Sequence, residues 1–408
     1  LVRTDDYGMT SLVRGVGLSG RGYESLAKHF QRVSCDVAKL SSLWRAVVLE
    51  TLEPKLYKVH GRLVQVVDST KGEKTGRRMP GVKALHSGGK GPFEAERIRG
   101  HHVHVSSILA GTFGNLTAVP LIARICEGIK RSPSDSRTVR ENMVGIEREM
   151  GPMPPSFVVG DRFFGSAYYI ESALEEGHEV ICRVRSNAVC RTLLSAEEAT
   201  AAHKGRGRKP KFADEGISVA VRAETEPSHE LPCPWDGSKM RVCSFIAYWP
   251  PLKRNVLWVV AKHASYRAPV IILSTQLSLT THDVLHKLYA PRWSIETAFM
   301  PMKHEIGIFK YRFWTSAVYR SRKAIGNLYL HRFEEKDRKA ILKKVESYNY
   351  FYQCCIIAQG LLQIVSLQLG SRVRESASFY LRTVRHESRP SEMVVRKVMT
   401  ASWSNFLK

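Results

Sequence analysis

The sequence predicts a mixed α/β protein in which helices flank a mixed sheet, and three observations support this. Apolar runs of strand length alternate with helical patterns between residues 63 and 185. Hydrophobic residues make up 43% of the 408 residues and charged residues 25%, the composition of a folded globular protein. Adjacent strands come first and alternating strands and helices follow. This order favours a sheet with both antiparallel and parallel neighbours.

The charge balance restricts the kind of partner. There are 62 Lys and Arg residues against 38 Asp and Glu, a net charge of +24, which indicates a polyanion or an anionic membrane surface. The basic residues are dispersed and form no amphipathic anchor, so nucleic acid is expected and a membrane is not. The most apolar stretch, 354–369, is interrupted by glutamines and predicts a buried helix. The 8 cysteines form no C-x-x-C pair, which argues against a zinc ribbon and favours reduced thiols in the cytoplasm.

The N-terminal region, 1–62, is predicted to be helical. Apolar residues recur at helical spacing over 23–33 and again over 37–52. Two interpretations remain open for this region. It is either a small helical DNA-binding unit or a helical layer packed on the next domain.

The segment 63–185 carries most of the predicted sheet. Each apolar run is bounded by turn signals or polar residues, and Ser134 or Asp135 is the expected cap of the first helix. His101, His102 and His104 cannot all converge on one metal, because alternate strand residues face opposite sides, and they predict a polar surface strand. The expected elements are strands at 63–68, 102–109 and 116–125, a helix at 134–150, a strand at 156–161, a helix at 167–176 and a strand at 179–184.

Residues 186–279 have a different sequence pattern from the segment before them and predict a β-rich insertion. Strand-like runs occur at 217–221, 242–249, 256–261 and 270–274 without a helical period between them. Three tryptophans in the insertion, Trp235, Trp249 and Trp258, are expected mainly as core residues, with base stacking as the alternative. The insertion interrupts a domain formed by 63–185 and 280–330. A basic, helical C-terminal region, 331–408, follows it.

A glycine-rich loop in the insertion is the best single candidate for phosphate contacts. It contains four basic residues within a short span, and its alternative interpretation is a solvated linker. These residues are Arg206, Arg208, Lys209 and Lys211.

Two carboxylates occupy matching places in the predicted sheet. Asp68 and Asp161 each end an apolar run, and binding sites are commonly built at the carboxyl ends of strands. Two like charges brought together there require a cation. Mg²⁺ and Mn²⁺ suit such oxygen ligands.

A third segment places four polar residues on one stripe of a predicted helix. The spacing Tyr-x2-Arg-x3-Glu-x6-Lys brings them within roughly 60° of one another on an ideal helix. A carboxylate between cations can hold a metal while the cations bind phosphate oxygens. The alternative is an exposed face with an Arg292–Glu296 ion pair, and Pro301 is expected to kink the helix. The four residues are Tyr289, Arg292, Glu296 and Lys303.

This spacing resembles the signature of DDE transposases of the insertion-sequence-4 group. Residues 76–83, 100–102, 160–165 and 312–314 resemble the same group. The resemblance implies a ribonuclease-H-like catalytic domain whose acidic triad is Asp68, Asp161 and Glu296. It also implies two divalent ions, Mg²⁺ or Mn²⁺, held by these carboxylates. Tyr289, Arg292 and Lys303 then position DNA phosphates.

The same resemblance implies a reaction and its partners. The enzyme would cut DNA at the ends of an insertion sequence by hydrolysis, and the freed 3′ ends would join target DNA by transesterification. The expected partners are terminal repeats and target DNA, with a dimer forming on DNA in the bacterial cytoplasm, associated with the nucleoid. Two alternatives stay open. One is a non-catalytic DNA-binding relic, suggested by Pro301 and the absence of an initial Met, and the other is a structure-specific nuclease on the same fold.

Overall fold

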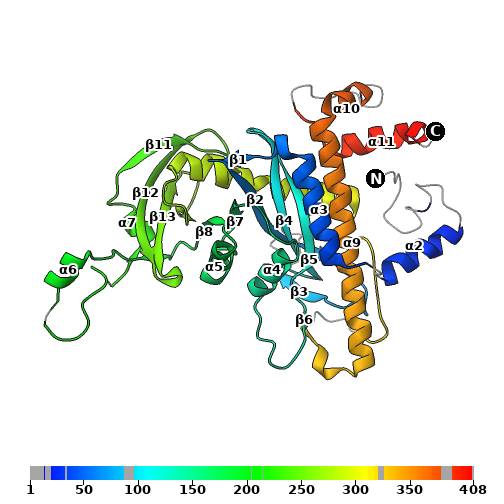
Figure 1. The fold of residues 1–408 in the computed structure, drawn as a ribbon, viewed down its shortest axis with the longest axis horizontal. Coiled ribbons are helices and arrows are strands. Elements are labelled where there is room, and N and C mark those ends of the chain that lie inside the picture. The colour runs from blue at the N-terminus through cyan, green and yellow to red at the C-terminus, as the bar shows by residue number, and fades with distance from the viewer. Residues whose placement is uncertain are drawn as a thin grey trace. The chain divides into compact units, whose positions relative to one another are not determined.

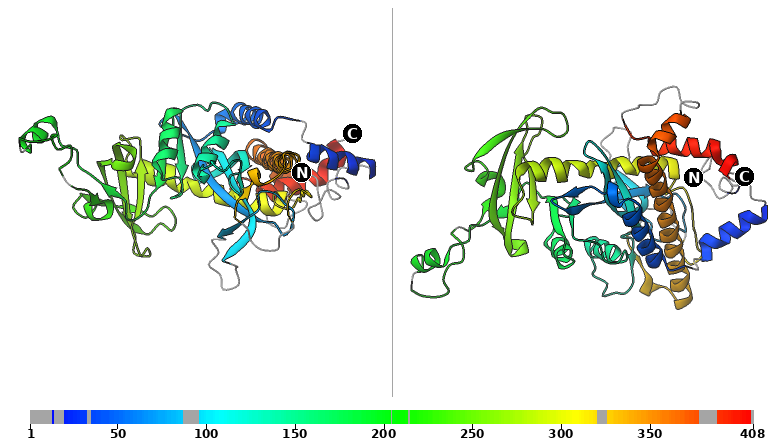
Figure 2. Two further views of the ribbon diagram at one scale, coloured as in Figure 1. Left: turned by 90° about the horizontal axis from the view of Figure 1, so that it is seen from below. Right: turned by 45° about the horizontal axis from the view of Figure 1, so that its top comes forward.

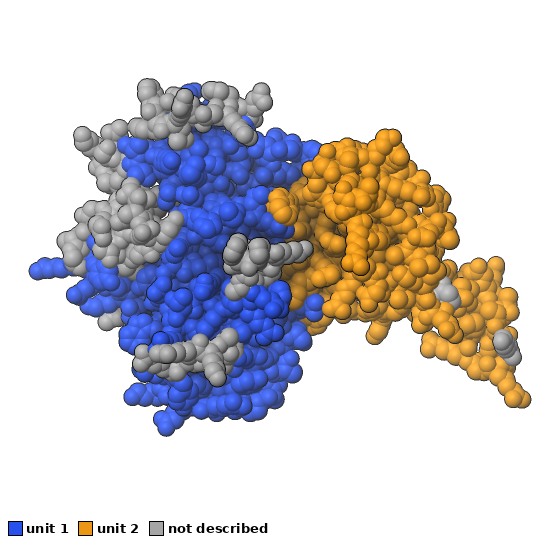
Figure 3. Space-filling view, turned by 180° about the vertical axis from the view of Figure 1, so that it is seen from behind, with its two compact units in different colours: residues 1–57, 68–152, 294–408 blue, residues 58–67, 153–293 orange. Residues whose placement is uncertain are grey.

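The computed structural model describes residues 13, 20–32, 35–86, 96–203, 205–213, 215–319, 326–377 and 388–406. The chain forms two compact units, which Figure 3 shows in different colours. Unit 1 comprises 1–57, 68–152 and 294–408, and unit 2 comprises 58–67 and 153–293. Strand β2 (Arg62–Glu73) contributes to both units.

Unit 2 contains a mixed sheet, which confirms the prediction of a mixed α/β protein. Strand β7 pairs in parallel with β2 and with β8, whereas the strands beyond β8 pair antiparallel. Helix α5 (Ala167–Glu175) connects β7 to β8. In sheet order the strands are β11 (Ser228–Pro232), β12 (Lys239–Trp249), β13 (Arg254–Lys262), β14 (Val270–Ser274), β8 (Glu179–Arg183), β7 (Ser156–Gly160) and the first half of β2.

The core of unit 2 lies between this sheet and α5. Trp258 is fully buried and Trp249 nearly so, as expected for core tryptophans, whereas Trp235 is 42% exposed and departs from that expectation. The predicted strand over 217–221 is a two-residue strand followed by a short helix. The remaining elements of unit 2 are β1 (Lys58–Val59), β9 (Val189–Cys190), α6 (Ala196–Ala201), β10 (Ile217–Ser218), α7 (Val219–Arg222) and η2 (Pro250–Leu252).

The register between β2 and β7 places the two predicted carboxylates. Val67 is paired with Gly160, and the next residues along each strand are Asp68 and Asp161. The apolar run ends at Asp68, but the strand does not. Contrary to the expectation of a strand end, β2 continues to Glu73, because its second half lies beside β4 in unit 1.

Unit 1 is built on a long antiparallel hairpin. Strands β4 (Arg97–Thr112) and β5 (Asn115–Ile125) pair along most of their length, and β3 (Lys83–His86) pairs with the start of β4. Phe113 and Gly114 form the hairpin turn between the paired residues Thr112 and Asn115. Gly114 adopts a φ of 87°, a conformation that glycine accepts without a steric penalty.

Helix α9 (Glu335–Gln368) is the central helix of unit 1. It packs against β5 and α3 (Val37–Thr51), beside which it runs in Figures 1 and 2. By length and composition α9 is apolar enough to cross a membrane, but 67% of its most apolar window is buried inside the protein. This burial fits the predicted core helix. Buried glutamines in α9 donate to neighbouring carbonyls, for example Gln353 to Leu121 and Gln359 to Ala298.

Other elements complete unit 1, and two of them correct the sequence analysis. Helix α4 (Val139–Arg148) begins later than expected, because a capping box of Thr138 and Glu141 starts it rather than Ser134 or Asp135. The histidine-bearing part of β4 is buried rather than a polar surface strand. The further elements are α2 (Gly20–Arg32), η1 (Glu53–Lys55), β6 (Ile129–Lys130), β15 (Leu328–Tyr329), η6 (Leu330–Arg332), α10 (Gly370–Ala377) and α11 (Glu392–Phe406).

Candidate functional site

The four signature residues lie on a segment that changes its helical type three times. A π-helix η3 (Asp283–Tyr289) leads through a 3₁₀ turn η4 (Ala290–Arg292) into α8 (Trp293–Pro301), and a second π-helix η5 (Met302–Ile306) follows. The single α-helical stripe expected from the sequence is therefore wrong at its two ends, Tyr289 and Lys303. π-helical turns are rare and frequently mark functional positions.

Unit 2 brings Asp161 close to one end of this segment. The carboxylate of Asp161 accepts a hydrogen bond of 2.7 Å from the amide of Phe163. Burial raises the pKa of Tyr289, the nearby Arg292 and Arg183 oppose this rise, and the charge of Asp161 adds to it. The guanidinium of Arg292 lies 5.9 Å from the centre of the Tyr289 ring. Asp161, Tyr289 and Arg292 thus share one electrostatic environment.

Arg183 is a site residue that the sequence analysis missed. Gly160 of β7 is paired with Cys182 of β8, so Arg183, the last residue of β8, lies at the level of Asp161, which follows β7. The available signal was the same as for the two aspartates, a charged residue directly after an apolar run. Attention to acidic residues alone overlooked it.

A groove of about 840 Å³ in unit 2 combines cations with aromatic rings. Its lining includes Arg183, Arg267 and Arg292, together with the exposed rings of Trp235, Tyr266 and Trp293. Guanidinium groups bind phosphate oxygens, and aromatic faces stack on bases. The groove therefore has the chemistry of a nucleic-acid surface.

Unit 1 carries the other two acidic residues, Asp68 and Glu296. Burial lowers the pKa of Lys303, and the charge of Asp68 opposes this shift, so the signature lysine lies within electrostatic reach of the first aspartate. Asp68 accepts a hydrogen bond of 2.7 Å from the amide of Ser69. Glu296 is half-buried on α8, and its neighbours Ile295 and Phe299 are buried.

The predicted basic loop belongs to an arm around α6, which extends from the strands of unit 2 in Figures 1 and 2. Arg206 and Arg208 are exposed. Lys209 donates to the hydroxyl of Thr200, and the ammonium of Lys211 lies 4.9 Å from the centre of the Tyr248 ring. The two arginines are therefore better placed for phosphate contacts than Lys211.

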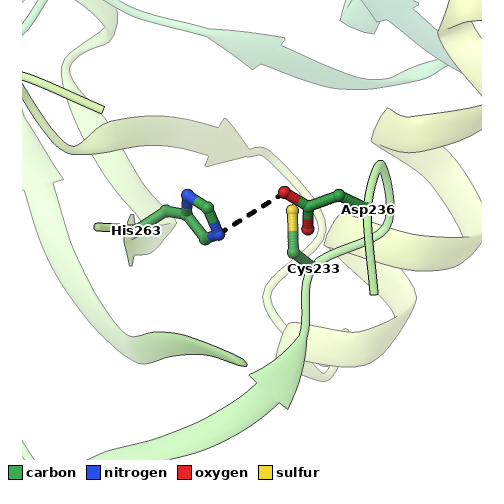
Figure 4. Close-up of side chains that lie close together, drawn as sticks. All are labelled: Cys233, Asp236 and His263. Atoms are coloured by element: carbon green, nitrogen blue, oxygen red, sulfur yellow. Dashed lines mark ion pairs between the residues drawn. The ribbon is translucent and has the colours of Figure 1, made fainter. Parts of the chain in front are cut away.

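Among the described residues, Cys233, Asp236 and His263 form a cluster of three metal-ligand types, with ligand atoms within 4.8 Å of one another (Figure 4). Their hydrogen bonds argue against a metal ion. The amide of Ser265 donates to Nδ1 of His263, so the proton of the neutral ring sits on Nε2, which lies 2.5 Å from the hydroxyl oxygen of Ser238. A metal needs a free lone pair on that nitrogen. The cluster is a set of hydrogen bonds that holds this turn in place.

The family model described as "Transposase DDE domain" matches residues 60–316. No curated protein matches significantly. The solved structures that match include the "Cryo-EM structure of piggyBac transposase synaptic complex with hairpin DNA", with 11% identity and a TM-score of 0.34. That alignment covers 97% of this chain and 63% of the piggyBac chain, so this chain spans less than two thirds of it. The family match, not this distant likeness, identifies the relatives of the chain.

Proposed function

Because this chain belongs to the transposase DDE domain family, we propose that it cuts DNA at the ends of a mobile element and joins the 3′ ends to target DNA. The observation that carries the proposal is the register between β2 and β7, after which Asp68 and Asp161 follow the paired residues Val67 and Gly160. Glu296 is proposed as the third carboxylate. We assign the chain to the insertion-sequence-4 group on its Tyr-x2-Arg-x3-Glu-x6-Lys spacing.

The donor set fits a hard divalent cation. Asp68, Asp161 and Glu296 offer only carboxylate oxygens, which Mg²⁺ and Mn²⁺ prefer. When bound, such ions polarise the phosphodiester and stabilise the charge that develops on the attacking and leaving oxygens. Two ions are proposed, held by these three carboxylates.

The basic and aromatic residues of the site are proposed to hold and orient DNA. Arg292 and Arg183 offer guanidinium groups to phosphate oxygens at the groove of unit 2, and Tyr289 is fixed by burial beside Arg292. Lys303, near Asp68, contributes a cation next to the first carboxylate. Orientation of the scissile phosphate, rather than proton transfer, is their proposed contribution.

The partners follow from the same proposal. The terminal repeats of the element and its target DNA are the proposed substrates, and the net charge of +24 supports a polyanionic partner. Joining two ends requires two active sites, so a dimer on DNA is proposed. A cytoplasmic, nucleoid-associated location goes with that substrate.

The proposal is tested with duplexes that carry the DNA flanking the chain's own coding sequence. Cleavage is measured with Mg²⁺, with Mn²⁺ and with chelator, for the wild type and for Asp68→Asn, Asp161→Asn and Glu296→Gln. We expect each substitution, and the chelator, to reduce cleavage by at least about a thousandfold, because one carboxylate of a shared ion site is lost. Glu171→Gln, at an exposed position of α5 outside the proposed site, is the matched control. Wild-type cleavage by any of the three variants would remove that residue from the triad.

The nuclease alternative is separated in the same reactions. A labelled target plasmid is added, and strand transfer is scored as a covalent joint between the element end and the plasmid. Cleavage without any joint product would favour a nuclease over a transposase. The non-catalytic relic predicts DNA binding with neither product.

A further inference from the structure

A buried hydrogen-bonded chain in unit 1 ends directly beside Asp68. Nε2 of His102 lies 2.8 Å from the hydroxyl oxygen of Ser69, and Nδ1 of His102 lies 2.6 Å from a carboxylate oxygen of Glu127. The ammonium of Lys83 donates to the other Glu127 oxygen at 2.5 Å. We call Ser69, Lys83, His102 and Glu127 the His102 network.

The charge of Glu127 decides which way the His102 ring is protonated. Burial by itself would raise the pKa of Glu127, but hydrogen bonds from His102 and Lys83 outweigh it and lower the pKa to about 2. The carboxylate is therefore ionised and can only accept. In the neutral His102 ring the proton then sits on Nδ1, and Nε2 accepts a hydrogen bond from the hydroxyl of Ser69.

This arrangement fixes Ser69 from both sides. Its hydroxyl is held by His102, whose side chain is only 8% exposed, and its amide donates to the Asp68 carboxylate at 2.7 Å. Three strands contribute to the restraint, because His102 lies on β4, Lys83 on β3 and Ser69 on β2. The backbone amide of Ser69 makes the hydrogen bond to the proposed metal ligand, and the contact of the Ser69 hydroxyl with His102 holds that residue in place.

We propose that Ser69, His102 and Glu127 are positioning residues that hold the Asp68 carboxylate in the orientation required for a divalent ion. The inference rests on the proposed function, because it takes Asp68 as a metal ligand. Groups that hydrogen-bond behind a metal ligand typically change metal affinity or activity by 10–100-fold when they are removed.

The same strand supplies a matched control. His104 of β4 is also buried and paired with a glutamate, Glu147, at 2.7 Å. This second histidine–glutamate pair does not include Ser69. His104→Ala therefore removes a comparable buried interaction without touching the chain that leads to Asp68.

The experiment measures binding of Mn²⁺ to the 408-residue chain without DNA, from the electron paramagnetic resonance signal of the free ion. We expect His102→Ala and Ser69→Ala to weaken Mn²⁺ binding by 10–100-fold. Ser69→Thr keeps the hydroxyl and should restore binding to within threefold of wild type. His104→Ala should bind Mn²⁺ as the wild type does. Thermal unfolding of each variant checks that it is folded, and Ser69→Ala is the test should His102→Ala fail to fold.

Two results would overturn the inference. Wild-type Mn²⁺ affinity in the folded Ser69→Ala variant would show that the network does not position Asp68. Equal losses in Ser69→Ala and His104→Ala would show a general effect of the β4 core. Failure of the proposed function has a different signature, since Asp68→Asn would then bind Mn²⁺ as tightly as the wild type.

Discussion

Lys74 offers the sharpest test of the packing in unit 1. It follows β2 directly and is 2% exposed, and its ammonium donates to the carbonyls of Phe309 and Tyr311 at 2.7 and 2.8 Å. The same ammonium lies 5.1 Å from the ring centre of Tyr348. Lys74 therefore anchors the residues that follow η5 to the end of β2. The perturbation is Lys74→Met, which keeps the length of the side chain and removes its charge.

The sign of the effect follows from the pKa of Lys74, which burial lowers from 10.5 to about 7. The unfolded chain binds more protons than the folded chain between these two values, so folding stability rises with pH across that window. The contribution is fully present above about 10.5 and is lost as pH falls through about 7. The full contribution of the Lys74 pKa shift to the free energy of unfolding is on the order of 5 kcal/mol. This corresponds to about 1.4 kcal/mol for each tenfold change in proton concentration.

The assay is urea unfolding of wild type and Lys74→Met from pH 6.5 to 9.5, with exposed Lys310→Met as the control. Met leaves two carbonyls without their donor, which costs about 1–3 kcal/mol each at every pH. The prediction therefore concerns the slope of the unfolding free energy against pH. Between pH 7 and 9, the free energy of unfolding of the wild type should rise by about 2–3 kcal/mol more than that of Lys74→Met. Burial keeps His101 out of this window by lowering its pKa to about 3. Parallel pH curves for the two proteins would refute the reasoning.

Two further predictions concern backbone packing and DNA binding. Gly100→Ala should destabilise the protein by at least about 2 kcal/mol in thermal or urea unfolding, because its Cβ would lie 2.1 Å from the carbonyl oxygen of Gly72. Gly145→Ala on α4 meets nothing within 4 Å and should instead stabilise by about 0.5–1 kcal/mol. Replacing Arg206 and Arg208 together by Ala should reduce the slope of log affinity for duplex DNA against log salt by about 2, measured by fluorescence anisotropy. An unchanged slope would exclude the arm from phosphate contact.

Most strands with apolar runs could be predicted from the sequence, although the run 217–221 is mainly a short helix, and the strands formed by polar residues could not be predicted. The run 63–67 and the run 156–160 are hydrophobic because both lie inside the sheet, and their boundaries match the β2–β7 register. The second half of β2, 68–73, is polar and becomes a strand only because it lies beside β4. A local sequence pattern does not indicate that a segment will pair with a strand that is distant in the chain.

Burial of polar side chains was the second limit of the sequence. His101 reads as a surface residue, yet its ring nitrogens meet the hydroxyl of Tyr352 at 2.6 Å and the carbonyl of Pro80 at 2.9 Å. These partners satisfy the ring inside the core, so its polarity carries no cost that would place it at the surface. The partner Tyr352 is 251 residues away in sequence. Asp68, Asp161 and Arg183 share a local signal, a charged residue directly after an apolar run, whereas the His102 network joins side chains of neighbouring strands and has no local signal.

The two histidines beside carboxylates show why residue type alone does not define a metal site. Nδ1 of His263 accepts a hydrogen bond from the Ser265 amide, so Nε2 of the neutral ring carries the proton and offers no lone pair to a metal. Nδ1 of His102 faces an ionised glutamate and must donate, which leaves Nε2 as an acceptor for Ser69. The backbone amide beside His263 thus makes its Nε2 a hydrogen-bond donor, whereas the carboxylate beside His102 makes its Nε2 an acceptor. The cluster with the ligand types of a zinc site is a hydrogen-bonded turn, and His102, held by the Glu127 carboxylate, supports the residue next to the carboxylate proposed to hold the ion.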